Sequence, residues 1–161
     1  MKFQTLVKNF ALQISGRNFK KPISTDTFAV LNERIDQHAV AVFRNQYLEN
    51  ELLLEFAETF GPLEVPLPFD QYGGVHEKIT MLANVDNKGD LLSPKDKHSI
   101  YMKGNLLWHS DSSYKHVPAK YSLLSALEVP SSGGETEFAD ARACYDDWHG
   151  PFGDIEKESL E

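Results

Sequence analysis

Prolines and glycines in the middle of the chain set the strongest limit on how it can fold. Between Gly61 and Lys78 stand Pro62, Pro66, Pro68, Gly73 and Gly74. This composition excludes regular structure over most of the stretch, because proline cannot donate a ladder hydrogen bond and glycine loses much conformational freedom on ordering. Residues 87–97 are also polar and rich in turn-forming side chains. Because long loops in compact domains are usually functional, we expect both segments to cover a binding site.

The first strand and helix are predicted from alternation and capping. Residues 10–14 alternate apolar and polar side chains, which is typical of a half-buried strand. Polar residues at 24–26 offer helix N-caps, and Leu31 and Ile35 then fall on one face of a helix that runs to about Gln37. The chain therefore opens with a strand followed by a helix.

A second strand and helix follow directly. Residues 39–43 form a short continuous apolar run, which predicts a strand covered on both faces. Leu52, Phe56 and Phe60 recur at helical spacing before Gly61 and the proline after it end the helix. We expect both helices to pack on a sheet.

The second half of the chain predicts further strands. Residues 79–85 are expected to form one, and residues 119–129 and 135–139 a pair joined by a tight turn. A short helix over 141–148 would be capped by Asp140. The chain has 10 Phe and 6 Tyr, side chains that suit a pleated surface. The predicted fold class is mixed α+β, mainly β.

Size and charge narrow the functional class. A chain of 161 residues is long enough for one core, so residues 1–161 are expected to form a single domain. The net charge of −8 argues against nucleic acid and anionic lipid as partners. No 18 apolar residues run together, and the N-terminus lacks a signal-peptide core, so no membrane segment is expected. The single cysteine, Cys144, fits a cytoplasmic protein and is expected to be a buried apolar residue of the last helix.

The motif Trp108-His109-Ser110-Asp111 carries the candidate chemistry. In extended backbone, residues i and i+2 share a face, so the His109 imidazole and the Asp111 carboxylate could reach one metal ion. A second histidine would complete the triad of two histidines and one carboxylate that leaves open positions on Fe(II). A motif this short also arises by chance, and a histidine hydrogen-bonded to a nearby carboxylate is the alternative. Ser112 and the neighbouring serines are expected to support the loop through hydrogen bonds.

Several segments around this motif resemble the family of taurine and 2,4-dichlorophenoxyacetate dioxygenases. They are residues 104–114, which contain the motif, residues 119–122 and residues 133–140, in the family's order and at its spacing. Residues 42–46 and 56–64 look like the family's early strand and helix. The resemblance covers about residues 10–148 and is closer to the members that act on aryloxyalkanoates than to the taurine enzyme.

The resemblance implies an Fe(II)- and 2-oxoglutarate-dependent dioxygenase. His109 and Asp111 would be iron ligands, Thr136 would contact the 2-oxoglutarate carboxylate, and Asn105 would lie on the substrate side. Fe(II) would be the cofactor, with 2-oxoglutarate and O2 as cosubstrates. A small substrate bearing a carboxylate or sulfonate would be hydroxylated, with succinate and CO2 as co-products. The implied fold is a double-stranded β-helix (a jelly roll, cupin-like) with flanking N-terminal helices.

The chain also departs from the family pattern. Family members are nearly twice as long, and their second ligand histidine and 2-oxoglutarate-binding arginine lie in the C-terminal half. His116 and His149 are poor substitutes for that ligand, and Arg142 is expected to be a solvated helix residue. Residues 1–161 thus resemble the N-terminal half of a dioxygenase domain, as a truncated gene product would. A half-barrel leaves sheet edges open, which predicts dimerisation, a rearranged sheet or poor solubility, and a homo-oligomer is the expected assembly.

Two rival functions remain open from the sequence. The chain could be a non-catalytic remnant or interaction module, which would be folded but would not turn over 2-oxoglutarate. It could also be a zinc-dependent hydrolase that uses His109 and Asp111 with His149 as the third ligand. Tight Zn(II) binding without any effect of 2-oxoglutarate would favour the hydrolase.

Overall fold

The chain divides into two compact units, each described here by itself. The computed structural model describes residues 1–65, 77–86 and 88–147. Unit 1 contains Met1–Asn18, Ile23–Gln46 and Ala126–Glu161, and unit 2 contains Phe19–Pro22 and Tyr47–Ser125. Within the described ranges, no helix is long and apolar enough to cross a bilayer. The assignment of residues 1–161 to one domain stays a prediction.

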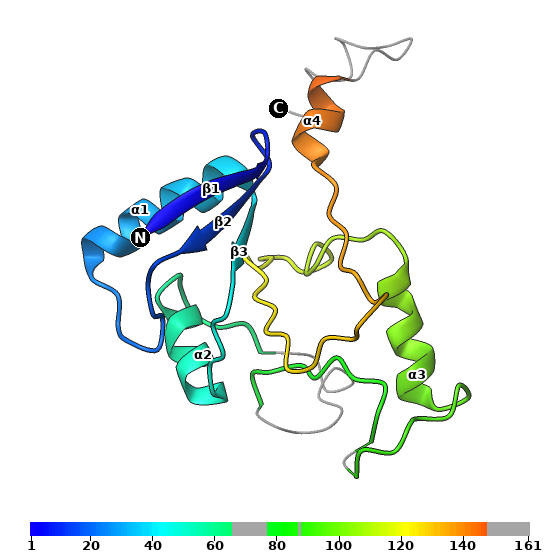
Figure 1. The fold of residues 1–161 in the computed structure, drawn as a ribbon. Coiled ribbons are helices and arrows are strands. Elements are labelled where there is room, and N and C mark those ends of the chain that lie inside the picture. Colours follow the sequence, from blue (N-terminus) through cyan, green and yellow to red (C-terminus); the bar gives the residue numbers. More distant parts are fainter. Residues whose placement is uncertain (66–76, 87, 148–161) are drawn as a thin grey trace. The chain divides into compact units, whose positions relative to one another are not determined.

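Unit 1 is built on a three-stranded mixed sheet with the strand order β1-β2-β3 (Figure 1). The strands are β1 (Lys2–Val7), β2 (Ala11–Ser15) and β3 (Val40–Phe43). Strand β2 pairs antiparallel with β1 and parallel with β3. Because a parallel pair needs a long crossover, helix α1 (Thr25–His38) connects β2 to β3. Leu12 and Ile14 of the central strand are almost completely buried and form part of the core.

The sequence predicted two of these strands and missed the third. The strand over residues 10–14 is confirmed as β2, and the apolar run at 39–43 is confirmed as β3. The expectation that β3 is covered on both faces is wrong, because its residues are only half-buried. Strand β1 was not predicted; its residues are all exposed, so burial leaves little mark on its sequence.

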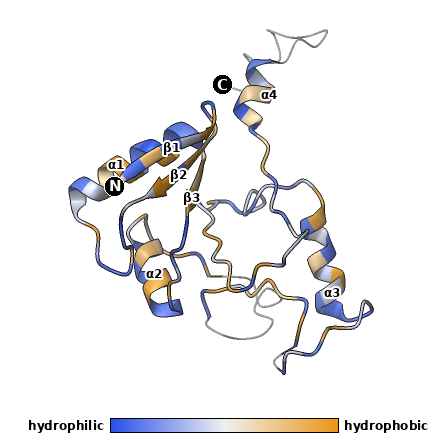
Figure 2. Cartoon of the chain, in the orientation of Figure 1, coloured by the Kyte–Doolittle hydropathy of each residue, from blue (hydrophilic) through white to orange (hydrophobic). Residues whose placement is uncertain are grey.

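Helix α1 follows the predicted capping and periodicity closely. The Ser24 hydroxyl accepts a hydrogen bond from the Thr27 backbone N–H at 3.3 Å and caps the helix. Leu31 and Ile35 are buried, and Figure 2 shows hydrophilic and hydrophobic residues alternating along the helix. The helix ends at Ala39, whose φ of 59° is left-handed and whose N–H donates to the Ile35 carbonyl at 2.7 Å.

Helix α4 (Ala141–Asp146) confirms the helix predicted after Asp140, whose side chain accepts from the Arg142 N–H. Arg142 makes contacts that are not expected of a solvated helix residue. Its guanidinium donates to three backbone carbonyls, those of Asp36 at 3.3 Å, Gln37 at 3.2 Å and Asn9 at 3.3 Å. Two of these carbonyls belong to the last turn of α1, where helix carbonyls lack partners within the helix. Arg142 therefore ties α4 to the end of α1.

The prediction for Cys144 is wrong. This residue lies in α4, as expected, but its side chain is exposed and not buried. A helix of six residues has little area to cover its own side chains, so a small apolar residue in it need not enter the core.

Unit 2 contains α2 (Asn50–Glu58), α3 (Lys97–Met102) and a 3₁₀ helix, η2 (Lys103–Leu106). Helix α2 confirms the second predicted helix. Phe56 of this helix belongs to a chain of edge-on aromatic contacts, Phe19–Phe56 at 5.3 Å, Phe56–Phe60 at 5.4 Å and Phe60–Tyr121 at 5.5 Å between ring centroids. Helices α3 and η2 were not predicted, although the Asp96 carboxylate caps α3 by accepting from the His98 N–H.

The strands predicted for the second half of the chain do not form. Residues 79–85 contribute isolated bridge positions at Ile79 and at Val85, which bridges to Leu91, and residues 119–129 and 135–139 lie outside any strand. The chain bends at residues 131–132 between the last two, and Gly133 and Gly134 have positive φ. Extended segments count as strands only when a neighbour completes their hydrogen bonds. The loop residues 66–76 and the predicted frayed tail from residue 150 lie outside the described residues.

Candidate metal centre

The backbone leading to the candidate ligands leaves η2 in an extended conformation. The Leu107 N–H donates to the Gly104 carbonyl at 3.1 Å and closes the 3₁₀ turn. Leu107 itself has φ −96° and ψ 147°, so the chain is extended as it approaches His109.

A backbone carbonyl sets the proton position on the His109 ring. Nδ1 of His109 lies 2.7 Å from the Leu107 carbonyl oxygen. Because a carbonyl can only accept, Nδ1 carries a proton and donates it. In the neutral ring Nε2 then keeps its lone pair, and this arrangement orients metal-binding histidines in many proteins.

The other ring nitrogen faces the predicted carboxylate. Nε2 of His109 lies 3.4 Å from Oδ1 of Asp111, which confirms that the two side chains share a face. The separation is longer than a good N–H···O hydrogen bond, which reaches about 3.2 Å. Two ligands at about 2.1 Å from a metal and at a right angle lie about 3.0 Å apart. Small side-chain movements would let one cation contact both atoms, and both side chains are about half exposed.

The described part of the chain provides two candidate ligands, His109 and Asp111. Across residues 1–65, 77–86 and 88–147, no group of three or more His, Cys, Asp and Glu side chains could hold a metal ion. His116 is exposed, and His149 lies outside the described residues. A nitrogen donor beside a carboxylate oxygen is a donor set that fits divalent iron, with further ligands required to complete the coordination.

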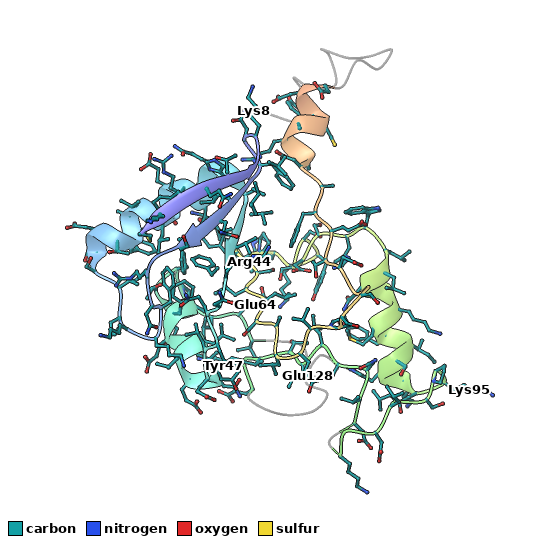
Figure 3. The ribbon with its side chains drawn as sticks, viewed as in Figure 1. Lys8, Arg44, Tyr47, Glu64, Lys95 and Glu128 are labelled. Atoms are coloured by element: carbon teal, nitrogen blue, oxygen red, sulfur yellow. The ribbon has the colours of Figure 1, made fainter. Side chains whose placement is uncertain are left out.

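A turn directly after the pair is held by a residue that the sequence analysis missed. The Ser112 hydroxyl lies 3.1 Å from both carboxylate oxygens of Glu64 and donates to them. The Lys115 ammonium also pairs with Glu64, which is labelled in Figure 3. Ser113 donates weakly to the Ser110 carbonyl at 3.5 Å, so the expected role of the serines in supporting the loop is confirmed. Glu64 stands 48 residues before Ser112, and no local pattern could connect them.

The two remaining predicted site residues lie in different units. Asn105 lies in η2 of unit 2, where it is exposed and its amide donates to the Met102 sulfur at 3.8 Å. Thr136 belongs to unit 1, in an exposed segment between the Gly133-Gly134 turn and α4. His109 and Asp111 are therefore the predicted site residues that the structure brings together.

Known proteins are similar to this chain over most of its length. The model of the family described as "Taurine catabolism dioxygenase TauD, TfdA family" matches residues 3–150. The 2,4-dichlorophenoxyacetate dioxygenase of Cupriavidus pinatubonensis is 33% identical over 140 residues, which are 85% of this chain and 49% of that protein. The (S)-phenoxypropionate dioxygenase of Sphingobium herbicidovorans is 39% identical over 112 residues, 68% of this chain and 35% of that one.

A solved structure is also similar to this chain over nearly its whole length. The crystal structure of AAD-2 in complex with Mn(II) and N-oxalylglycine superposes with a TM-score of 0.83 and is 34% identical; the match covers 99% of this chain and 53% of that one. The chain thus spans about half the length of the relatives it matches. On the family match over residues 3–150 and on these identities, the chain belongs to the TauD/TfdA family of dioxygenases.

Proposed function

We propose that this chain carries part of the active centre of an Fe(II)- and 2-oxoglutarate-dependent dioxygenase, with His109 and Asp111 as iron ligands. The observation that carries the proposal is the His109 ring, whose Nδ1 is bound by the Leu107 carbonyl while Nε2 faces Asp111 at 3.4 Å. Family membership supports iron as the metal and 2-oxoglutarate as the cosubstrate. The family gives no support to a zinc-dependent hydrolase.

Bound iron would supply O2 activation coupled to oxidative decarboxylation of 2-oxoglutarate. The chain's own residues would bind the metal and orient the cosubstrate and the substrate. His109 and Asp111 hold the metal. The Thr136 hydroxyl contacts the 2-oxoglutarate carboxylate, and Asn105 faces the substrate. Both residues are exposed in the described chain, so their side chains are accessible to small molecules.

The proposed substrate is a small organic anion, hydroxylated with release of succinate and CO2. Relatives named for 2,4-dichlorophenoxyacetate, phenoxypropionate and sulfonate support a carboxylate or sulfonate group. The net charge of −8 gives the molecule no general attraction for nucleic acid or anionic lipid, so the recognition of such a substrate must be local. We place this chemistry in the cytoplasm.

We also propose that residues 1–161 correspond to the N-terminal half of a jelly-roll dioxygenase domain. The extended segments 119–129 and 135–139 would then pair with strands supplied from outside the described chain. Leu106, Leu107 and Trp108 beside the metal pair are 83%, 71% and 70% exposed, and apolar side chains so exposed favour a covering partner. We propose that the covering partner is a second copy of this chain. A mass clearly above the 18.2 kDa of one chain in light scattering would support this, and a mass of 18.2 kDa would contradict it.

The function is tested by adding Fe(II) and 2-oxoglutarate to the purified chain without oxygen. The account predicts the weak visible charge-transfer band of the chelate, which then fades when O2 is admitted. Thr136→Val, which removes the hydroxyl, should weaken 2-oxoglutarate binding about tenfold, as expected when a charge-assisted hydrogen bond worth about 1.5 kcal/mol is lost. Thr136→Ser keeps the hydroxyl and is the matched control. A folded chain that gives no band would instead be the non-catalytic remnant.

A further inference from the structure

We propose that Glu64 is a positioning residue of the metal centre, which holds the turn after Asp111 and so keeps His109 and Asp111 facing one point. The inference rests on the proposed function, because it takes this pair as the metal ligands. Glu64 does not join the pair as a third ligand, since the described residues hold no metal-binding group of three. Its role would be exerted through Ser112 and Lys115.

A single carboxylate binds both ends of the turn. The Lys115 N–H donates to the Ser112 carbonyl at 2.9 Å, so these two residues begin and end a four-residue turn. The Glu64 carboxylate accepts from the Ser112 hydroxyl at 3.1 Å and from the Lys115 ammonium. The Lys115 and Glu64 side chains are 20% and 34% exposed, so water screens the pair only in part. Charge-assisted hydrogen bonds are stronger than neutral ones.

The backbone of this turn needs such support. Ser112 has a φ of 56°, in the left-handed region that side-chain-bearing residues rarely adopt. A residue stays in that region when its surroundings hold it there. Ser112 directly follows Asp111, so its backbone angles set the direction in which the segment carrying His109 and Asp111 meets the turn. The Glu64 contacts therefore act on the residue directly after the pair, at a backbone conformation that needs support.

Glu64 is itself anchored to a packed part of unit 2. It stands four residues after Phe60, whose ring packs on Phe56 at 5.4 Å and on Tyr121 at 5.5 Å. Residues 60–64 therefore contact the segment after the metal pair at two places, through Phe60 at Tyr121 and through Glu64 at the turn. Because both contacts come from one short segment, the turn is tied to the aromatic contacts that Phe60 makes with Phe56 and Tyr121.

The test compares Glu64→Ala with Glu58→Ala in the full 161-residue chain. Glu58 is a matched control, because it is also a glutamate of unit 2 that faces a lysine, Lys78, at 3.9 Å. The first readout is Mn(II) affinity, from the paramagnetic resonance of free Mn(II). The second is hydrogen exchange of the Lys115 amide in the metal-free chain. Glu64→Gln, which keeps an acceptor oxygen for Ser112, is the conservative variant.

We expect Glu64→Ala to weaken Mn(II) binding by about 10–100-fold, the usual effect of losing a residue that orients ligands. Lys115 exchange should accelerate in the same variant. Glu58→Ala should match the wild type in both readouts, and Glu64→Gln should keep most of the affinity. Wild-type Mn(II) affinity in Glu64→Ala would overturn the proposal.

A wild-type chain that binds no Mn(II) would count against the proposed function itself. The exchange readout then decides the role of Glu64 separately, because it needs no metal. Faster exchange of the Lys115 amide in Glu64→Ala supports the proposal that Glu64 stabilises the turn. An unchanged exchange rate overturns that proposal.

Discussion

At the scale of single residues, the chain shows which contacts can be predicted locally. The His109–Asp111 pair follows from spacing alone, because extended backbone places residues i and i+2 on one face. The contacts of Glu64 and Arg142 could not be predicted, since their partners stand 48 and more than 100 residues away. Long polar side chains on the surface give no periodic signal, so their partners are known only from the fold.

Asp140 gives a residue-scale prediction about acid stability. The hydrogen bond from the Arg142 side chain lowers the pKa of Asp140 below its ordinary value of 3.8. A carboxyl whose pKa is lower in the folded state stabilises the fold above its unfolded pKa, and this contribution is lost as the pH falls through the folded value. The effect should be small because the Arg142 side chain is about half exposed and water screens its charge.

The variant Asp140→Asn isolates this charge, because asparagine is an equally good N-cap for α4. Between pH 5 and about pH 2, the wild type should lose stability more steeply than the variant. Urea unfolding at a series of pH values measures both slopes. Equal slopes would mean that the Arg142 contact contributes nothing to acid stability.

At the scale of elements, the sequence predicts helices better than strands. Helix α1 was predicted because its cap, Ser24, and its buried stripe lie within one segment. The segments 119–129 and 135–139 have strand-like sequences but lack neighbouring strands within the described residues. Since a strand depends on a partner that is distant in sequence, its side-chain pattern alone does not establish it.

The packing of α1 on the sheet is the element-scale prediction. Leu31 is completely buried, whereas its neighbour Val30 is 41% exposed. Leu31→Ala should lower the free energy of unfolding by about 2–5 kcal/mol, because it removes buried methyl groups and leaves a cavity. Val30→Ala, the control on the same helix, should change it by about 0.5 kcal/mol or less. Denaturant unfolding of both variants checks this, and equal losses would contradict the packing.

At the scale of the whole molecule, the chain provides part of a family architecture. It matches relatives over most of its own length but spans about half of theirs. In the described residues it brings together two candidate ligands, whereas the facial triad of non-haem iron enzymes needs three protein ligands. The family could be recognised from short segments in the right order. The third ligand could not be predicted, because His116, the histidine after Asp111 within the described residues, is exposed and belongs to no group of three ligating side chains there.

The most direct test of the central claim is an anaerobic calorimetric titration of the chain with Fe(II). Wild-type protein is compared with His109→Ala and Asp111→Ala, and with His116→Ala as a control on a nearby exposed histidine. The account predicts that both ligand variants bind Fe(II) at least about tenfold more weakly and that His116→Ala binds like the wild type. Wild-type Fe(II) affinity in His109→Ala would show that the metal centre does not lie at this pair.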